Sequence, residues 1–476
     1  MSFSFGFSGD DIEDDGETEP QHNVGGDAHA LVTDMTKHSI SDADSEVPRP
    51  QTIEPKRHSL AELLESLPSQ ISYNTLTIPR LTVPSTSFSS SASTSTARAD
   101  KDNDPVVQVL RRSLFDIRAQ LMAEADPETH DDAAETMLAG LENGDLTSGI
   151  YEGGFKTWEC ALDLASLVTQ YLDTNSLKPD QLQSHIPHDL EVIELGAGSA
   201  IPSLALLRVF SQQISLSSYS LSSSPEEQRP ASQNTLLPRL KFTLCDYNAE
   251  VLRLCTAPNV FLNYYQHYQQ YGRHQTGTGT GTGDPNSASA GEPTPSSSSS
   301  LPPTQEKETL EEGELDIEEV LGDGQPSIQD LIKDMESRHH VSFDFVSGGW
   351  GESFLELITD KPPRSQPPYS SSPSSLAAAA EKQWQSTGDL LILASETIYS
   401  PSSSRIFADI LLGVLRRHGQ SKGTARAWVA AKKVYFGVGG GVDEFVADIK
   451  SRGGKSRILL ETKDTGVGRV VLEITV

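Results

Sequence analysis

Residues 190–202 read Leu-Glu-Val-Ile-Glu-Leu-Gly-Ala-Gly-Ser-Ala-Ile-Pro, and this stretch decides the fold. The apolar run Val192–Leu195 is typical of a short, buried parallel strand. The glycine turn 196–198 follows, and Pro202 suits the first turn of a helix expected at 203–210. A strand, a tight turn and a helix start in this order are typical of the ligand-binding edge of an open α/β sheet.

The chemistry of this turn favours a nucleoside cofactor that carries a positive charge. The glycines let a ligand approach the backbone, and the helix start offers free N–H groups. A dinucleotide site would need a third glycine where this chain has Ile201, which weakens a nicotinamide-oxidoreductase interpretation. Glu194 precedes the first glycine by two residues. E-x-G-x-G after a strand resembles the pattern of S-adenosylmethionine (SAM) methyltransferases, whose cofactor suits an acidic residue. The alternative is a plain glycine turn.

The later strands place further polar residues at the same edge. Residues 240–246 predict a second strand that ends at Asp246, and a carboxylate there can accept from both hydroxyls of a ribose. Further strands are predicted to begin at residues 341, 389, 427, 456 and 468. We therefore expect a Rossmann-like, seven-stranded α/β sheet with helices on both faces and an antiparallel hairpin as its last two strands. The predicted helices are 160–172, 249–268, 402–416 and 442–449.

Composition limits the class of partner and the compartment. The 476 residues include 37 Lys or Arg and 67 Asp or Glu, a net charge of −30, which argues against nucleic acid and favours a basic partner. Cys160, Cys245 and Cys255 match no zinc or disulfide pattern, so we expect no metal site and a reducing compartment. No signal peptide or membrane-length apolar run is evident. The expectation is a monomer in the cytosol, the nucleus or both, without a membrane partner.

Composition also divides the chain into ordered and low-complexity parts. Residues 1–58 are predicted to be a disordered acidic tail, with Lys56-Arg57-His58 as a solvated turn. Residues 59–80 are predicted to be a short helix, with Ser59 and Glu62 as a capping box, and an extended strap. A linker at 81–104 leads to the α/β domain at 105–476, which should open with an amphipathic helix over 107–121. Low-complexity insertions are expected at about 211–238, 272–336 and 361–387.

Two tryptophans and one polar strand end are further candidates for the site. Trp158 follows the glycine-rich loop 149–157, which could fold against adenine or a methionyl tail; Trp158 could equally anchor the core. Trp350 follows a predicted strand end and could stack on adenine or fill the core. The apolar strand from Asp389 ends in Ser-Glu-Thr-Ile-Tyr, 395–399, as a central strand facing an active site does.

Six motifs combine these candidates: Gly149–Leu164, Ile193–Pro202, Asp246–Asn248, Ser347–Trp350, Ser395–Tyr399 and Tyr435–Gly441. Together they resemble the protein-histidine methyltransferases of the seven-β-strand SAM class, and the opening Met1–Phe7 resembles the fungal members. The resemblance implies SAM-dependent methylation of a histidine in a large-subunit ribosomal protein, with a role in ribosome biogenesis or translation. It implies that the SAM site is lined by Thr157, Trp158, Glu159, Cys160, Glu194, Gly196, Gly198, Asp246, Tyr247, Asn248, Gly349, Trp350 and Ser395.

Histidine is a reasonable acceptor on chemical grounds. Its ring has a reference pKa of about 6.5 and is largely neutral near pH 7.4, whereas deprotonating a lysine there costs roughly 4 kcal/mol. An imidazole enzyme therefore needs an acceptor that fixes the tautomer. Glu396 or Asp246 could fill this role, and we expect Glu396 to do so, with Tyr399 as an aromatic wall; Glu396 could instead cap the next helix. Related lysine methyltransferases carry D-x-x-Y at this place, so a lysine methyltransferase stays open, as does a non-catalytic ribosome-assembly factor.

Overall fold

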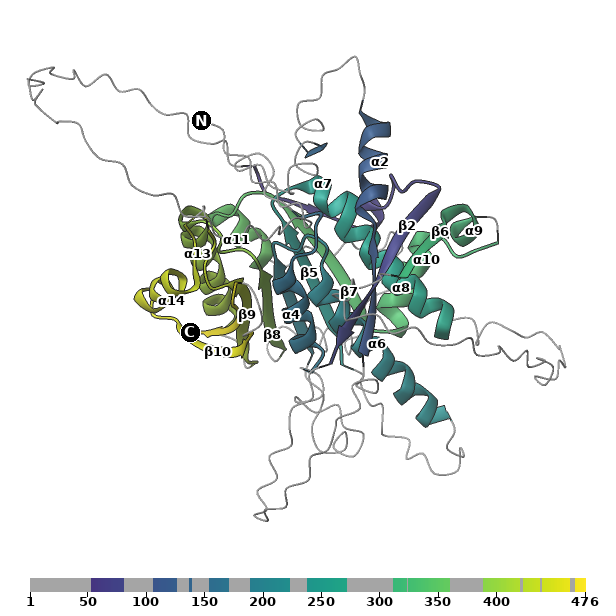
Figure 1. Cartoon of the computed structure of the whole chain (residues 1–476). Helices are drawn as coiled ribbons and strands as arrows, with labels where there is room; N and C mark the ends of the chain where they lie inside the picture. The colour runs from purple at the N-terminus through teal and green to yellow at the C-terminus, as the bar shows by residue number, and fades with distance from the viewer. Residues whose placement is uncertain are drawn as a thin grey trace, which may run out of the picture.

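An eight-stranded sheet forms the centre of the fold (Figure 1), in the order β1-β7-β5-β4-β8-β9-β11-β10. The computed structural model describes residues 53–80, 106–125, 137–138, 154–170, 189–222, 238–271, 311–322, 324–359, 388–419, 423–436, 439–462 and 467–476. The strands are β1 Lys56–His58, β4 Leu190–Leu195, β5 Leu240–Asp246, β7 Val341–Ser347, β8 Asp389–Ser395, β9 Ala425–Lys432, β10 Lys455–Glu461 and β11 Arg469–Thr475. Strands β7, β5, β4, β8 and β9 pair in parallel, and β11 lies antiparallel between β9 and β10. The predicted Rossmann-like α/β fold is confirmed.

The observed sheet has one strand more than predicted, the edge strand β1. The basic cluster 56–58 was expected to be a solvated turn in a disordered tail, and this was wrong. It pairs antiparallel with β7 at the edge of the sheet. The Arg57 guanidinium donates to Asp344 Oδ2 at 3.0 Å and to the Leu357 carbonyl at 2.6 Å. These contacts hold a short polar strand that has no apolar pattern of its own.

Helices cover both faces of the sheet because its strand side chains alternate between two apolar clusters. Val192 packs into one cluster and its neighbour Ile193 into the other. The first cluster includes residues of α4 Glu159–Val168, α6 Ile201–Ser222, α8 Ala257–Tyr271 and α10 Ile328–Arg338. The second includes residues of α11 Glu352–Thr359, α13 Pro401–His418 and α14 Val442–Ser451. Helix α6 continues to Ser222, so the prediction of an insertion from residue 211 placed its start too early.

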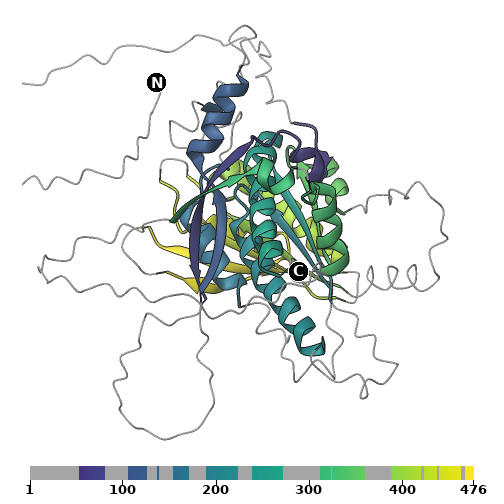
Figure 2. The same ribbon diagram turned by 90° about the vertical axis from the view of Figure 1, so that its right-hand side faces the viewer.

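A second, three-stranded sheet has the order β3-β2-β6 (Figure 2). Its strands are β2 Gln70–Pro79, β3 Val106–Arg112 and β6 Glu311–Asp316, and β2 follows the short helix α1 Leu60–Leu63. The helix predicted over 107–121 is wrong in its first half: β3 occupies that half, and α2 Leu114–Glu124 begins after the cap Ser113. Val107 and Val109 are both buried, the alternation of a strand.

The predicted insertion 272–336 is also ordered in its last part. Besides β6, residues 311–338 contain α9 Ile317–Leu321 and α10. Leu315 and Ile317 pack against the apolar clusters, and a capping box of Ser327 and Asp330 starts α10. The acidic composition of this stretch concealed its few anchoring residues. The predicted tail before residue 53, the linker and the insertion at 361–387 lie outside the described residues.

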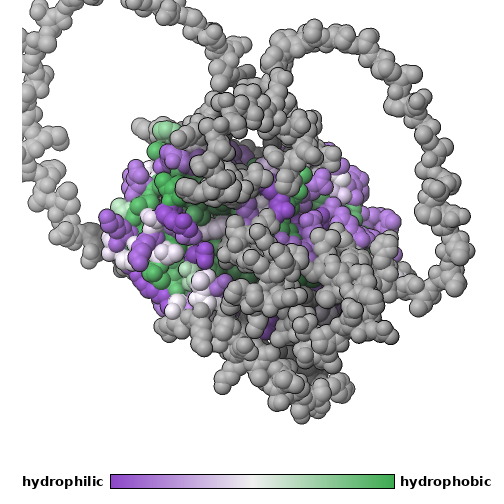
Figure 3. Space-filling model, turned by 90° about the horizontal axis from the view of Figure 1, so that it is seen from below, coloured by the Kyte–Doolittle hydropathy of each residue, from purple (hydrophilic) through white to green (hydrophobic). Residues whose placement is uncertain are grey.

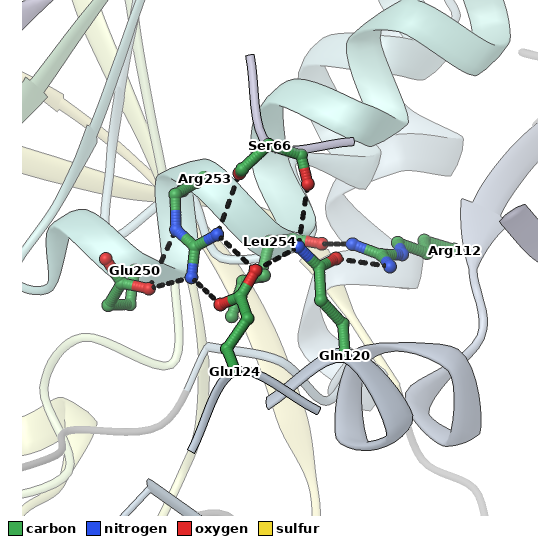
Figure 4. A network of polar contacts seen from close by, with 7 residues as sticks. All are labelled: Ser66, Arg112, Gln120, Glu124, Glu250, Arg253 and Leu254. Carbon is green, nitrogen blue, oxygen red and sulfur yellow. Dashed lines mark hydrogen bonds and ion pairs between the residues drawn. The ribbon is translucent and has the colours of Figure 1, made fainter. Parts of the chain in front are cut away.

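A polar network fastens α2 to the body of the domain (Figure 4). The side chain of Arg112 is buried and donates to Asp116 Oδ2 at 2.5 Å, Gln120 Oε1 at 2.7 Å and the Leu254 carbonyl at 3.0 Å. Arg253 joins Glu124 of α2 to Ser66 and Glu250. Helix α2 is thereby fixed beside the π-helical turn Leu252–Thr256, which links α7 Ala249–Val251 to α8.

The surface seen from below mixes hydrophilic and hydrophobic residues over its described part (Figure 3). Among the described helices, none combines the length and the apolar character that crossing a bilayer requires.

Candidate active site

The glycine turn after β4 is the centre of the site. Gly196 and Gly198 have φ angles of 70° and 51°, which glycine adopts without steric cost. A Cβ atom on Gly198 would lie 2.9 Å from the carbonyl oxygen of Gly154. The chain before α4 therefore passes directly over the turn, and the glycines are required by packing within the protein as well as by any ligand.

Side chains from three elements hold this turn in place. The Thr256 hydroxyl, in the π-helical turn, donates to the Gly198 carbonyl at 2.6 Å, and Asn259 Nδ2 of α8 donates to the Ser199 carbonyl at 3.0 Å. Thr157, before α4, shares a 2.8 Å hydrogen bond with the Ser199 hydroxyl. π-Helical turns occur frequently at functional sites, and this one contacts the loop that the sequence singled out.

The two predicted acidic residues occupy different places. Asp246 Oδ2 accepts from the Gly198 N–H at 2.9 Å and Oδ1 accepts from the Asn248 N–H at 3.2 Å, so this carboxylate joins the ends of β4 and β5. Glu194 is fully buried behind the turn, where Oε2 accepts hydrogen bonds from the hydroxyl and N–H of Ser203. Burial raises the pKa of Glu194 to about 8, against the opposing effect of the Ser203 bonds.

The start of α4 brings a ring and two charges to the edge. Trp158 is the N-cap residue, and the ammonium groups of Lys156 and Lys432 lie 4.9 Å and 5.3 Å from its ring centroid. Glu159 pairs with Lys432 at 3.2 Å. Cys160 is fully buried, and burial together with the neighbouring Glu396 raises the pKa of its thiol.

Glu396 lies opposite α4, directly after β8. It is a non-glycine residue with a left-handed φ of 56°, an uncommon conformation that is concentrated at functional sites. The Tyr435 hydroxyl donates to Oε2 of Glu396 at 2.5 Å. The other carboxylate oxygen, Oε1, is buried and lies 3.8 Å from the Lys432 ammonium. It accepts no hydrogen bond from the described residues. The cap of the next helix, α13, is Ser400. Glu396 therefore faces Tyr435 and Lys432 rather than capping that helix.

The other predicted residues lie at the ends of neighbouring strands. Ser395 is the last residue of β8, and Tyr399 is partly buried with its carbonyl accepting from the Gly440 N–H at 3.1 Å. The Tyr247 carbonyl accepts from the N–H of Gly348 at 3.2 Å. Beyond β7, the Gly349 N–H donates to the Ile53 carbonyl, and Trp350 packs 5.3 Å from Phe407. Trp350 thus contacts the core, which is one of the two positions that the sequence left open for it. Residues 149–153, the first part of the glycine-rich loop before Trp158, lie outside the described chain.

Three buried polar atoms at this edge have no hydrogen-bond partner within the described residues: Asn248 Nδ2, Glu396 Oε1 and Thr397 Oγ1. They lie just beyond the ends of β5 and β8. Buried polar groups are normally satisfied, so this set is suited to a polar ligand that supplies both donors and acceptors. Asn248 next to Asp246 fits the polar edge of a nucleoside, and the residues present fit a cofactor of that kind.

Sequence reasoning missed Lys432 and gave Tyr435 no role, although its motif was recognised. Both contact Glu396 only because β8 and β9 are neighbours in the sheet. Lys432-Lys433 at the end of an apolar strand was the available signal, since polar residues at a strand's carboxyl end face the site. In the part of the chain that the structure describes, no cluster of three or more His, Cys, Asp or Glu could hold a metal.

Curated proteins similar to this chain share one name. Histidine protein methyltransferase 1 of Saccharomyces cerevisiae is 27% identical over 452 residues, which span 94% of this chain and 90% of that protein. The protein of the same name from Schizosaccharomyces pombe is 28% identical over 369 residues, 76% of each chain. A Bos taurus homologue is 24% identical over 333 residues, 70% of this chain and 58% of that protein. No family model matches the chain.

Proposed function

We propose that this chain, which belongs to the histidine protein methyltransferase family, transfers a methyl group from SAM to a histidine imidazole of a large-subunit ribosomal protein. The relatives support a protein methyltransferase with a methyl donor and a protein substrate.

The glycine turn and its surroundings are the proposed SAM site. Gly196, Gly198 and Asn248 would lie against the nucleoside and Trp158 against the methionyl end, with Asp246 fixing the turn that carries them. Bound SAM would supply an electrophilic methyl carbon on a sulfonium, which departs as a neutral thioether when a nitrogen lone pair takes the methyl group. Catalysis by the chain is then mainly alignment of that nitrogen with the methyl carbon.

The observation that carries the histidine assignment is the open Oε1 atom of Glu396. The carboxylate is fixed by Tyr435 through Oε2, and Oε1 is buried without a hydrogen-bond donor among the described residues. A neutral imidazole has one N–H and one lone pair. If its N–H donates to Oε1, the other nitrogen is the nucleophile, so Glu396 selects the tautomer.

Glu396 also suits the charge that the ring acquires. When the ring nitrogen forms its bond to the methyl carbon, the ring becomes cationic while its N–H still points at the carboxylate. The attraction between them strengthens as the charge develops, which favours the transition state over the ground state. The ring can then lose that proton to the carboxylate or to water, and no strong base is needed beforehand.

The ribosomal substrate is supported by charge. The chain has a net charge of −30, and ribosomal proteins are basic as a class, so the two should attract. We also propose that the protein works in the cytosol, the nucleus or both, because Cys160, Cys245 and Cys255 are buried free thiols suited to a reducing compartment.

Labelled SAM tests the cofactor and the substrate together. Ribosomal subunits from cells lacking this gene would be incubated with the wild type or with Gly196→Arg, and their proteins separated. We expect label in one large-subunit protein with the wild type alone. Label confined to other proteins would contradict the ribosomal substrate. Calorimetry that detects NAD binding and no SAM binding would contradict the cofactor.

A further inference from the structure

Lys432 lies between Glu159, Glu396 and Trp158 in the proposed active site. It is the last residue of β9, and its side chain is 24% exposed. Its ammonium lies 3.2 Å from Glu159 Oε2, 3.8 Å from Glu396 Oε1 and 5.3 Å from the centroid of the Trp158 ring. One resident cation therefore contacts the carboxylates of Glu159 and Glu396 and the aromatic face of Trp158.

Carboxylates and an aromatic face are the groups that would bind the ammonium of a substrate lysine. A cation is attracted to a carboxylate by charge and to an indole face by the ring quadrupole. In this chain, those groups are already in contact with Lys432. An incoming ammonium would have to displace it or lie beside a like charge.

The local charges balance without a charged substrate. Glu159 and Glu396 supply two negative charges, and Lys156 and Lys432 supply two positive charges. A neutral imidazole leaves this balance unchanged when it binds and becomes cationic only as the methyl group is transferred, whereas a lysine ammonium brings an excess positive charge into a partly buried site on binding. Removing the charge of Lys432 would leave a net negative charge, which is the complement of an ammonium.

We infer that Lys432 is a specificity-determining residue, which favours histidine over lysine by filling the place that a substrate ammonium would occupy. This inference deepens the proposed function and rests on it. It names the resident cation, rather than the shape of the pocket, as the source of the discrimination.

Lys432 keeps its charge at neutral pH. Burial by itself would lower the pKa of the ammonium, but the carboxylates of Glu396 and Glu159 raise it by more, and the net shift is upward. Its backbone N–H donates to the Tyr435 hydroxyl oxygen at 3.2 Å, which ties the end of β9 to the same cluster. The backbone of Lys432 is thus fixed by Tyr435, and its ammonium by Glu159 and Glu396.

Three variants separate charge from structure. Lys432→Met removes the charge and Lys432→Arg retains it. Lys433→Met removes an equal charge one residue away, where the ammonium pairs with Glu461 at the rim of the sheet. Thermal melting and SAM binding would show that each variant is folded.

Two measurements on the full chain would use different probes. The first titrates n-butylammonium, which reproduces a lysine side chain, and follows the indole N–H signal of Trp158, assigned with Trp158→Phe. The second compares transfer of label from SAM to two peptide libraries that differ only in a fixed central histidine or lysine.

We expect n-butylammonium to bind Lys432→Met at least tenfold more tightly than the wild type, which corresponds to about 1.4 kcal/mol. The ratio of lysine to histidine labelling should rise by a similar factor. Lys432→Arg and Lys433→Met should behave like the wild type. Unchanged binding of n-butylammonium in folded Lys432→Met would overturn the inference, as would an equal gain in affinity in Lys432→Arg. A wild type that labels neither library would defeat the proposed function, while the titration would still decide the role of Lys432.

Discussion

At the scale of single residues, Glu396 concentrates the unusual features of the site. It has a left-handed backbone, a hydrogen bond from Tyr435 and a buried oxygen atom without a donor among the described residues. Its position was predictable, because a polar residue directly after the most apolar strand faces the site. Its partners were not, because Lys432 ends and Tyr435 follows β9, a strand that is adjacent in the sheet and distant in sequence.

Replacing Glu396 should separate catalysis from cofactor binding. We expect Glu396→Ala to lower turnover about 100-fold, because the ring loses the acceptor that selects its tautomer. SAM affinity should stay within about twofold of the wild type, and Glu396→Gln, which keeps one acceptor oxygen, should lose less activity. Single-turnover kinetics and calorimetry measure the two quantities. Loss of SAM binding in Glu396→Ala would make this residue a cofactor ligand instead.

The raised pKa of Glu194 predicts a stability that depends on pH. The group has a reference value of 4.5 and holds its proton in the folded state up to about pH 8. The favourable contribution of Glu194 to the free energy of unfolding is therefore complete below pH 4.5 and is lost as pH rises through 8. Compared with Glu194→Gln, the wild type should lose up to about 1.4 kcal/mol per pH unit in this window. Denaturant unfolding at pH 5 to 9 measures the difference, and parallel curves for the two proteins would contradict it.

At the scale of elements, the glycine turn depends on the segments packed around it. Pattern and composition located the turn, but its close contact with Gly154 depends on a loop that precedes α4. The stretch 107–121 was predicted less well. Its apolar residues are spaced by three and four, as in a helix, but they also alternate at 107 and 109, as in a strand. The strand β3 forms because side chains of α8 accept hydrogen bonds from its free edge. Asn263 and Asn259 accept hydrogen bonds from the N–H groups of Leu110 and Arg112.

Gly198→Ala should impair the site through this packing. The added methyl group would lie 2.9 Å from the Gly154 carbonyl in a backbone with a φ of 51°, so the turn must shift. We expect SAM affinity to fall at least tenfold while the chain stays folded. The substitution Gly453→Ala, at another positive φ with open space around it, is the control for backbone strain. Wild-type SAM affinity in Gly198→Ala would show that the turn does not hold the cofactor.

Arg112→Met should loosen α2. The buried guanidinium contacts Asp116, Gln120 and the Leu254 carbonyl, and its loss leaves these groups without their donor. We expect the free energy of unfolding to fall by about 3 kcal/mol. Chemical denaturation measures this loss, with Arg405→Met, at an exposed position of α13, as a control of equal charge. A change below 0.5 kcal/mol, the range of ordinary surface substitutions, would show that the network adds little.

At the scale of the whole molecule, the order of the sheet and the strong acidity are the features that matter for function. The sheet brings the ends of β4, β5, β8 and β9 to one edge, and the sequence predicted this arrangement because each strand ends in polar or glycine residues. The edge strand β1 and residues 311–338 escaped prediction, since their few anchoring side chains stand among charged residues.

The acidity predicts that salt weakens capture of a basic substrate. The net charge of −30 should attract a ribosomal protein over distances that salt screens. Raising NaCl from 50 to 300 mM should increase KM for that substrate at least about threefold with little change in kcat. Steady-state labelling measures both constants. A KM that is independent of salt would exclude long-range attraction as the source of recognition.

Histidine methylation at this site is tested most directly by amino-acid analysis of the labelled product. The labelled protein would be hydrolysed in acid after reaction with the wild type, Gly196→Arg or Glu396→Ala. We expect the label in methylhistidine with the wild type, none with Gly196→Arg and a small fraction with Glu396→Ala. Label in methyllysine would leave the fold and the cofactor in place and contradict the assignment of histidine as the acceptor.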